Sequence, residues 1–466
     1  MLVTRDRMPG AGRREPGPPE CSELAGGSTS RTGHLWFNGA VPPRLPALLA
    51  APDAGARTLW LTSARLIDGT GAAPREGACV LVRDGRIERV GAAGEAVPEG
   101  ATAIDLGGRT LMPGLVDAHA HVYAKPPKPA EGAEPLLPGT EAHLVAAYLR
   151  EALRRGITTI RDVGSWNDVV VEVRQAMRLG AFRGPRLLTC GRIVSATAPG
   201  GRFFEGMYRE ADGPDAVRQA VREQLKRGAD FIKVMTTGAR SVELEDPDPA
   251  QLTRAEIATL VEESHRMGYR VAAHAEGLAG TEIAVEEGID TIEHGMYLNQ
   301  RPDLLERMAE RGQVLVPTLS CFYGVAGIDA GGGQAAPTWS PLLVELARYN
   351  LEQADHTLRA ARAAGVAIAL GFDWTPFYDG ALELERLVHH GLPAAEALVA
   401  ATATGAHALG LADHVGTVRA GKLADLLVVD GDPLADPGVL RRRERVWLVL
   451  QLGEPVAGAA LEAALA

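Results

Sequence analysis

Two histidines, His119 and His121, end the apolar run TLMPGLVDAHAHV at residues 110–122. Side chains two apart on a β-strand project from the same face, so a strand here would point both imidazoles in one direction. Two such imidazoles can bind one metal ion at Zn–N distances of about 2.0 to 2.1 Å. Asp117 shares this face, where its carboxylate could orient an imidazole or serve the fold alone. The spacing therefore predicts part of a metal site, and the other ligands must come from elsewhere in the chain.

Four more side chains with ligand chemistry stand at or near the ends of apolar runs: Lys233 in FIKVM, His274 in VAAHAEG, His294 in TIEHG and Asp373 in IALGFDW. An ammonium group surrounded by Phe, Ile, Val and Met must be neutral, paired or chemically changed. A lysine that reacts with CO2 forms a carbamate, whose two oxygens could bridge two cations. His274 and His294 would supply imidazoles for the second cation, and a carboxylate as buried as that of Asp373 needs a cation nearby.

Each of these residues also has a structural reading when it is taken alone. Lys233 could extend its ammonium group to the surface along its alkyl stem. A single histidine on an apolar strand is more often a hydrogen-bonded core residue than a ligand. Six such placements on five separate strands are difficult to obtain independently, so the set favours a shared metal centre.

The chain between residues 111 and 411 alternates β-type runs with helical stretches. Thr253 and Glu256 have the spacing of a capping box at the start of one such stretch. Eight strand-then-helix units can be counted, which predicts an α/β fold of the (β/α)8 TIM barrel type. An open doubly wound sheet is the alternative, but no GxGxxG follows the first strand to favour it. In a barrel, functional residues lie at the C-terminal ends of the strands, where all six candidate ligands are placed.

Residues 58–110 and 412–460 have a different sequence pattern, in which short β-type runs are separated by turn residues. Asp84 and Gly85 form a typical two-residue hairpin turn. Neither segment alone has enough strands to bury a face. We therefore expect both to form one small β-sandwich domain beside the barrel.

Residues 1–57 lack hydrophobic periodicity, and residues 1–34 are rich in Gly, Pro, Arg and Ser. We expect an extension without regular structure that ends in a linker, although LPALLAAPDAGA at 45–56 could also be a targeting remnant. Arg13 and Arg14 resemble part of a twin-arginine signal, but no apolar stretch follows them. Export is therefore not expected.

The composition is that of an ordinary globular protein and limits the function classes. Acidic residues outnumber basic ones, 59 to 48, for a formal net charge of -11, and no basic stripe stands out in the body of the chain. Nucleic acid and anionic membranes are therefore not expected as partners, and no stretch reaches the about 18 apolar residues of a membrane span. The four cysteines, Cys21, Cys79, Cys190 and Cys321, form no CxxC pair. Reduced thiols and a cytoplasmic location are expected.

The ordered motifs VDAHAH, FIKVM, AAHAEG, TIEHG and GFDW, with the tail GKLADLLVVDGDP, resemble those of the amidohydrolase superfamily, in its branch of imidazolonepropionase-like and prolidase-like enzymes. The resemblance covers about residues 58–455. It implies a (β/α)8 barrel and two divalent metal ions, usually zinc. On the family's pattern the ligands are His119, His121 and Asp373 for one metal and His274 and His294 for the other, with carboxylated Lys233 as the bridge.

From this ligand set we expect hydrolysis of an amide bond in a small molecule. A hydroxide that bridges two metals is a strong nucleophile at neutral pH, and Asp373 could pass its proton to the leaving nitrogen. Prolidase-like relatives suggest a dipeptide or an N-acyl amino acid, whose carboxylate needs a cation. Arg202 and Arg240, on the loops after the third and fourth strands, are the candidates, and Tyr297 could donate a hydrogen bond to the developing oxyanion.

The loops that should bind substrate depart from the family's pattern. Relatives often carry Gly-Gly-His-Gly after strand 3, Ser/Thr-Gly-Gly after strand 4 and His-Gly after strand 8, where this chain has ATAPGG (196–201), TTGA (236–239) and Asp379-Gly380. Cyclic amides or lactones are therefore alternative substrates. A mononuclear deaminase with Glu276 as its acid is a second alternative, although such enzymes typically lack the lysine, and a scaffold without catalysis is a remote third. The sequence leaves the oligomeric state open between a monomer and a ring packed through its helices.

Overall fold

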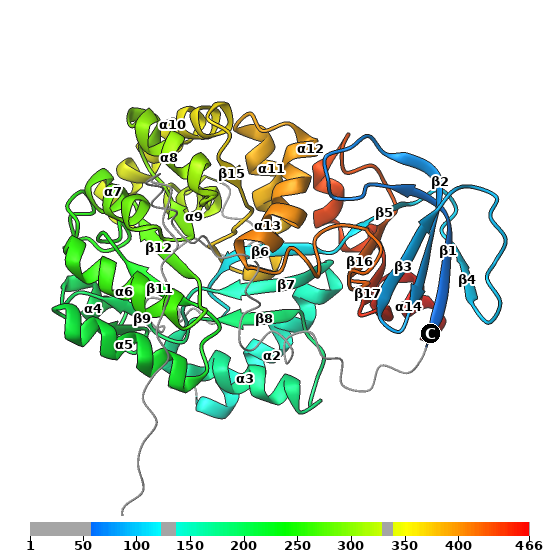
Figure 1. The fold of residues 1–466 in the computed structure, drawn as a ribbon, viewed down its shortest axis with the longest axis horizontal. Helices are drawn as coiled ribbons and strands as arrows, with labels where there is room; N and C mark the ends of the chain where they lie inside the picture. Colours follow the sequence, from blue (N-terminus) through cyan, green and yellow to red (C-terminus); the bar gives the residue numbers. More distant parts are fainter. Residues whose placement is uncertain (1–56, 123–136, 329–338, 466) are drawn as a thin grey trace, which may run out of the picture. The chain divides into compact units, whose positions relative to one another are not determined.

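Strands and helices alternate along most of the chain in the computed structural model (Figure 1). The structure describes residues 57–122, 137–328 and 339–465. The predicted N-terminal extension therefore lies outside the described residues, apart from Arg57. No helix within the described ranges is long and apolar enough to cross a membrane.

Eight strand positions form the barrel, and their hydrogen-bonded pairs run parallel. They are β6 (Leu115–Ala120), β7 (Ile157–Asp162), β8 (Arg186–Thr189) continued by β9 (Ile193–Ser195), β11 (Ile232–Met235), β12 (Val271–Ala275), β13 (Thr291–His294), β14 (Val314–Val316) and β15 (Ala367–Ile368). The third position is divided because β8 pairs with β7 and β9 pairs with β11. A short strand, β10 (Tyr208–Glu210), adds to the other edge of β9.

The ring closes between the eighth strand position and the first. The backbone N–H of Ala118 donates to the carbonyl oxygen of Leu370, and that of Asp373 donates to the carbonyl oxygen of His119, both at 2.9 Å. Gly371 permits this close approach, since a Cβ there would lie 2.6 Å from the Cβ of His119. The predicted (β/α)8 barrel is confirmed, and the open doubly wound sheet is wrong.

Helices follow the strand positions and lie outside the ring (Figure 1). They are α2 (Pro138–Arg154), α3 (Val169–Arg178), α5 (Pro214–Arg227), α6 (Arg254–Arg266), α7 (Leu278–Glu287), α8 (Pro302–Arg311), α10 (Pro341–Ala363) and α11 (Ala381–His389), followed by α12 (Ala394–Val399) and α13 (Gly405–Ala408). Two shorter helices, α4 (Pro199–Phe203) and α9 (Leu319–Val325), stand in the loops after β9 and β14. The capping box at α6 is confirmed, because the Thr253 side chain accepts from the backbone N–H of Glu256 and the Glu256 carboxylate accepts from that of Thr253.

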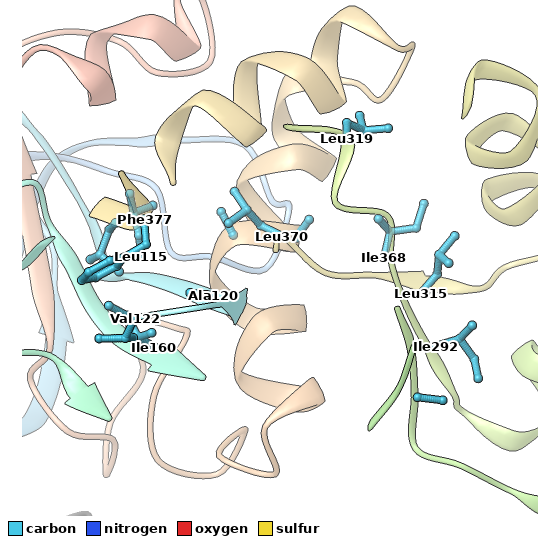
Figure 2. Packing of buried hydrophobic residues seen from close by; sticks show 14 of the residues in the cluster. Leu115, Ala120, Val122, Ile160, Ile292, Leu315, Leu319, Ile368, Leu370 and Phe377 are labelled. Carbon is cyan, nitrogen blue, oxygen red and sulfur yellow. The ribbon is translucent and has the colours of Figure 1, made fainter. Parts of the chain in front are cut away.

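Apolar side chains of the strands pack against the surrounding helices and loops (Figure 2). Ile160, Ile292 and Leu315, on β7, β13 and β14, are fully buried. Burial of each such side chain stabilises the fold by about 1.5 to 3 kcal/mol. Because this packed layer fixes the strands, residues at the strand ends stand on a rigid base.

A separate sheet combines strands from both ends of the described chain, as predicted. Its strands are β1 (Thr58–Leu66), β2 (Arg75–Arg83), β3 (Arg86–Gly91), β4 (Thr102–Asp105), β5 (Thr110–Pro113), β16 (Leu426–Val429), β17 (Val446–Gln451) and β18 (Glu454–Ala457). The order is β18-β17-β16-β5-β1-β2-β3, with β4 also paired to β1, so one continuous sheet joins the two segments. The hairpin turn between β2 and β3 is confirmed, with φ of 48° at Asp84 and 77° at Gly85. The domain boundaries near residues 110 and 412 stay predictions.

Candidate metal centre

Five of the six candidate ligands lie near or beyond the carboxyl ends of barrel strands, and Lys233 is the second of the four residues of its strand. The ring centroid of His119 lies 5.6 Å from that of His121 and 5.3 Å from that of His294, and the ring centroids of His274 and His294 are 4.5 Å apart. His119 is on β6 with His121 directly after it, Lys233 is on β11, His274 is on β12, His294 ends β13 and Asp373 follows β15. The barrel thus brings together, on one rim, side chains that are far apart in the sequence.

Hydrogen bonds fix which ring nitrogen of His119 and His121 is free. Nδ1 of His119 lies 2.6 Å from Oε2 of Glu293, and Nδ1 of His121 lies 2.6 Å from the carbonyl oxygen of Gly164. An ionised carboxylate and a carbonyl can only accept, so in the neutral form of each ring Nδ1 carries the proton and Nε2 keeps its lone pair. Both Nε2 atoms are therefore free to bind a metal ion.

These two Nε2 atoms converge on one carboxylate oxygen. Oδ1 of Asp373 lies 3.5 Å from Nε2 of His119 and 3.4 Å from Nε2 of His121. Charge-assisted hydrogen bonds are shorter, at about 2.7 to 2.9 Å. Ligand atoms about 2.0 to 2.1 Å from a tetrahedral zinc ion lie about 3.3 to 3.4 Å from one another. The spacing of the three atoms fits a shared cation better than it fits direct hydrogen bonds.

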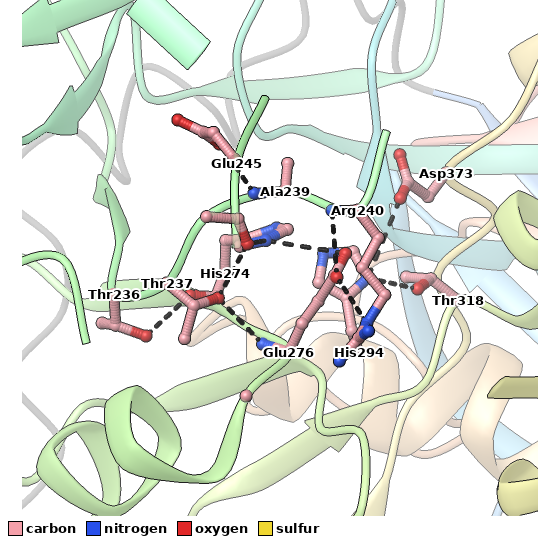
Figure 3. A network of polar contacts seen from close by, with 12 residues as sticks. Thr236, Thr237, Ala239, Arg240, Glu245, His274, Glu276, His294, Thr318 and Asp373 are labelled. Carbon is pink, nitrogen blue, oxygen red and sulfur yellow. Dashed lines mark hydrogen bonds and ion pairs between the residues drawn. The ribbon is translucent and has the colours of Figure 1, made fainter. Parts of the chain in front are cut away.

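His274 and His294 form a second pair of imidazoles (Figure 3), and the ring centroid of His294 lies 5.3 Å from that of His119. Nε2 of His274 lies 3.1 Å from the carbonyl oxygen of Gly238, in the TTGA loop, and Nδ1 of His294 lies 2.7 Å from Oγ1 of Thr318. Burial lowers the pKa of His274 to about 3 and the pKa of His294 well below its usual value. Both rings are therefore neutral, which is the form that binds metal.

Two groups of described residues could hold a metal ion, and both include His294. The first group joins it to His119 and Asp373, and the second joins it to His274 and Glu276. Within each group the ligand atoms lie within 4.8 Å of one another. His294 is within reach of both groups, so the two groups lie side by side, although its one free ring nitrogen can bind only one ion.

Lys233 is almost completely buried, and its Nζ has no hydrogen-bond partner among the residues that the structure describes. Burial lowers the pKa of Lys233 to about 8, so more of the amine is unprotonated at neutral pH than for an exposed lysine. A buried polar group without a partner is unfavourable. The amine is thus both more reactive than usual and short of a partner, as expected of a lysine that carries an added group.

Glu293 is the carboxylate that orients the ring of His119. Its other oxygen accepts from Nη2 of Arg161 at 2.8 Å and from the hydroxyl of Thr291. Burial raises the pKa of Glu293, but Arg161 and Lys233 together outweigh burial and hold the pKa well below its usual range. Glu293 therefore stays ionised and accepts from the histidine.

The sequence gives only a weak signal for Glu293, which stands directly before a candidate ligand in TIEHG. Neighbouring side chains on a strand point to opposite faces, so Glu293 and His294 are not expected to serve one site. The left-handed φ of 69° at His294 interrupts this alternation. A glutamate next to a histidine at a strand end is the pattern that could have indicated it.

Of the two roles expected for Asp117, its hydrogen bonds support the structural one. Its Oδ1 accepts the backbone N–H groups of His119 and Phe372, at 3.0 and 3.2 Å. These bonds tie the first strand position to the eighth. Burial raises the pKa of Asp117 to about 7. The residue supports the strand that carries the histidines, while Glu293 orients the imidazole.

Arg240 and Tyr297, two of the predicted substrate-binding residues, lie together. The guanidinium of Arg240 is 5.3 Å from the centroid of the Tyr297 ring. It pairs with Asp248 at 3.0 Å and with Glu276 at 3.3 Å, and the Glu276 carboxylate also accepts the backbone N–H of Arg240. Burial raises the pKa of Glu276 to about 8. Glu276, the acid of the deaminase alternative, is thus engaged by an arginine.

The structure gives less support to the other two predicted substrate contacts, the Tyr297 hydroxyl and Arg202. The hydroxyl of Tyr297 donates to Oδ1 of Asn350 at 2.7 Å, which leaves its proton engaged away from an oxyanion. Arg202 is exposed on α4 and forms no ion pair with any residue in the described ranges. Roles for the Tyr297 hydroxyl and for Arg202 stay predictions.

A model of the amidohydrolase family matches residues 110–456. The chain belongs to this family. Ochratoxinase of Aspergillus niger is 30% identical over 439 residues, which cover 88% of this chain and 89% of that enzyme. Imidazolonepropionase of Symbiobacterium thermophilum is 25% identical over 384 residues, which cover 76% of this chain and 84% of that enzyme. Among solved structures, a Xaa-Pro dipeptidase with methionine bound in the active site has a TM-score of 0.77 at 28% identity, covering 86% of this chain and 100% of that one.

Family membership confirms two predictions made from the residues. The fold is an amidohydrolase barrel with an added domain, and the protein is a hydrolase that acts on amide or peptide bonds. Members of the family generally use a divalent metal ion and act on small molecules. The convergent histidines and carboxylate supply donors suited to such an ion.

Proposed function

We propose that this chain hydrolyses an amide bond in a dipeptide or an N-acyl amino acid, with two divalent metal ions at the histidine cluster. One observation carries the proposal, the convergence of Nε2 of His119 and Nε2 of His121 on Oδ1 of Asp373 at 3.5 and 3.4 Å. That spacing suits three ligands of one cation. The neutral rings of His274 and His294 beside it support a second.

Zinc is the expected metal, because the donors are imidazoles and a carboxylate in a small buried space. His119, His121 and Asp373 would hold one ion, and His274 and His294 would hold the other. When bound, such a pair lowers the pKa of a water molecule and polarises a carbonyl group.

Lys233 would complete the site as a carbamate. The unprotonated Nζ adds to the carbon of CO2, so that an N–C bond forms, one C–O double bond becomes single, and a proton leaves Nζ for solvent. The product carries one negative charge shared by two oxygens. The buried Nζ without a partner among the described residues supports this step, since the added oxygens would have cations as partners.

Asp373 is the proposed general base and general acid. Burial raises its pKa, but His119 and His121 lower it, and the net direction of the pKa is down. The carboxylate is therefore ionised and can take a proton. Oδ1 faces the two histidines, which leaves Oδ2 to accept the proton and then return it to the leaving nitrogen.

Arg240 is the proposed partner of the substrate's carboxylate. Its guanidinium carbon lies 5.3 Å from the centroid of the Tyr297 ring, within the range of a cation–π contact. It also pairs with Glu276, whose carboxylate lies 3.6 Å from Nε2 of His274, so the positive charge is close to the metal-binding histidines. The other partner, Asp248, has a side chain that is 72% exposed. A substrate carboxylate could replace such an exposed partner at little cost.

The relatives support a peptide-type amide. One similar solved structure is a Xaa-Pro dipeptidase, and the ochratoxinase matches this chain over most of its length. The match to imidazolonepropionase favours a cyclic amide or lactone as a second candidate substrate.

Metal content per chain, measured by elemental analysis on protein expressed with zinc and bicarbonate, tests the centre. We expect two metal ions in the wild type and a sharp loss in Lys233→Ala. A single ion that the variant retains would make Lys233 structural and favour deaminase substrates. Metal-free wild type would contradict the proposed metal centre.

A substrate panel then tests the reaction. It pairs dipeptides and N-acyl amino acids with their carboxamide analogues, and it includes cyclic amides and lactones. We expect cleavage of the acids and weaker cleavage of the carboxamides. Cleavage confined to the cyclic compounds would replace the proposal with the second candidate.

A further inference from the structure

Thr318 has a backbone conformation that β-branched residues rarely adopt. It follows β14 directly before α9, with φ of 49° and ψ of 47°, in the left-handed region. Such a conformation is unfavourable for threonine and persists only where the surroundings enforce it. Because this threonine is also fully buried, its conformation points to a role for its side chain.

The hydroxyl of Thr318 contacts a proposed metal ligand (Figure 3). Oγ1 lies 2.7 Å from Nδ1 of His294 and donates its one proton to the carbonyl oxygen of Pro317 at 2.8 Å. With its proton engaged, the hydroxyl can only accept at the imidazole, so Nδ1 carries the proton of the ring and Nε2 has the lone pair. Another acceptor near Nδ1, Oδ2 of Asp373, lies 3.9 Å away, which is too far for a hydrogen bond.

Glu383 on α11 holds the turn that presents Thr318. Its Oε1 accepts the backbone N–H of Leu319 at 2.7 Å, and its Oε2 accepts the N–H of Ser320 at 2.8 Å and the Ser320 hydroxyl. These are the first N–H groups of α9, so a fully buried carboxylate caps this helix and fixes the residue before it. A helix that follows the eighth strand position thus holds a threonine for a histidine on the sixth.

His294 differs from the other three histidines in the kind of group that it meets. The others bond to the carboxylate of Glu293 and to the carbonyl oxygens of Gly164 and Gly238, which cannot donate. A hydroxyl can either accept or donate. The tautomer of His294 therefore depends on which acceptor the Thr318 hydroxyl donates its proton to.

We propose that Thr318 is a positioning residue for the second metal ion, whose hydroxyl holds His294 in the tautomer that leaves Nε2 free to bind that ion. The inference rests on the proposed function, because it requires a second cation at His274 and His294. The left-handed turn and the Glu383 cap are the devices that place the hydroxyl.

The test compares zinc binding by the wild type, Thr318→Val, Thr318→Ser and Thr318→Gly. Valine keeps the branched shape without the hydroxyl, serine keeps the hydroxyl, and glycine removes the hydroxyl while adopting the left-handed conformation without a steric penalty. Thr402→Val is the matched control, because its buried hydroxyl also donates to a carbonyl oxygen, that of Leu398 at 2.6 Å. Competition with a chelator gives dissociation constants for the first and second zinc ions, and circular dichroism checks the fold.

We expect Thr318→Val and Thr318→Gly to weaken binding of the second zinc ion by about 10- to 100-fold, the usual effect of removing the partner of a ligand histidine. Thr318→Ser and Thr402→Val should bind both ions as the wild type does. In cobalt-loaded wild type, the Nδ1–H proton of His294 should give a shifted, exchangeable signal in the proton NMR spectrum. That signal should disappear or exchange faster with water in Thr318→Val.

Wild-type affinity for the second ion in both variants without the hydroxyl would overturn the inference and leave the proposed function intact. A loss in Thr318→Ser as large as that in Thr318→Val would also overturn it, since the hydroxyl would not be the cause. A wild type that binds a single ion would overturn the proposed function and this inference with it. If Thr318→Val does not fold, Thr318→Gly decides, because glycine lacks the hydroxyl and adopts the left-handed conformation without a steric penalty.

Discussion

Replacement of Glu293 with glutamine should weaken both the folded state and the metal centre. Glu293 is fully buried between two donors, with Oε2 2.6 Å from Nδ1 of His119 and Oε1 2.8 Å from Nη2 of Arg161. Glutamine has the same shape but only one acceptor oxygen, and its NH2 group can only donate. Whichever way the amide turns, its NH2 group faces a donor, so one buried donor loses its acceptor.

The size of the loss follows from the charge that is left behind. Removal of one partner from a buried ion pair destabilises a protein by about 3 to 5 kcal/mol, because an uncompensated charge stays buried. Arg161 keeps two other acceptors, the carbonyl oxygen of Ala118 at 2.5 Å and the hydroxyl of Thr291 at 3.1 Å. We therefore expect a loss near ~3 kcal/mol, at the lower end of that range. Affinity for the first metal ion should fall by about 10- to 100-fold, because His119 loses the group that orients it.

Denaturant unfolding of the metal-free protein measures the first quantity, and zinc competition measures the second. Glu396→Gln is the control, because Glu396 bonds Arg362 at 2.6 and 2.7 Å with side chains that are 44% and 51% exposed. Such surface pairs contribute about 0 to 1 kcal/mol. A Glu293→Gln protein that unfolds and binds zinc as the wild type does would refute the reasoning, since the buried pair would then have no measurable role.

Three other charged side chains give outcomes of their own. Asp373→Asn should abolish turnover while elemental analysis still finds bound metal, and full activity would remove Asp373 from proton transfer. Arg240→Met should raise KM for a substrate with a free carboxylate by about 10- to 100-fold, since a charged hydrogen bond contributes about 1.5 to 3 kcal/mol, and it should change KM for the carboxamide analogue little. Hydrogen bonds from Arg222 and Arg266 lower the pKa of Glu263 to about 2, so its carboxylate stabilises the fold above its unfolded-state pKa of about 4.3 and loses that effect as the pH falls toward 2. Thermal unfolding should therefore separate Glu263→Gln from the wild type at neutral pH and bring the two together near pH 2.

The ligands on the rim could be predicted because the fold itself brings them together. Parallel strands of a barrel end on the same side, so a polar residue that ends an apolar run is carried to that side from whichever strand it belongs to. The capping box of Thr253 and Glu256 and the turn at Asp84 and Gly85 could also be predicted from the sequence. Their geometry depends on residues within four positions of one another, so the surrounding fold does not need to be known.

The groups that hydrogen-bond to the ligand histidines could not be predicted, because they depend on contacts between distant segments. Glu293 lies 174 positions from His119 in the sequence, and Gly164 lies 43 positions from His121. No periodicity relates such positions, and only the register of neighbouring strands brings them within 2.6 Å. Arg202 shows the converse, since its place after the third strand predicts a site residue while the structure leaves it exposed on a short helix.

The hydrogen-bond partners of the histidines also indicate which of the two metal positions should bind its ion more strongly. The first position combines the negative charge of Asp373 with the ring of His119, which Glu293 makes more basic. The second position has two imidazoles backed by neutral acceptors, a carbonyl oxygen and the hydroxyl of Thr318. An anionic ligand set attracts a divalent cation more strongly than a neutral one, so the first position should fill first and the second should depend most on the carbamate of Lys233. At a position that weak, a single hydrogen bond to a histidine is enough to change occupancy, which is why the hydroxyl of Thr318 should have a measurable effect there.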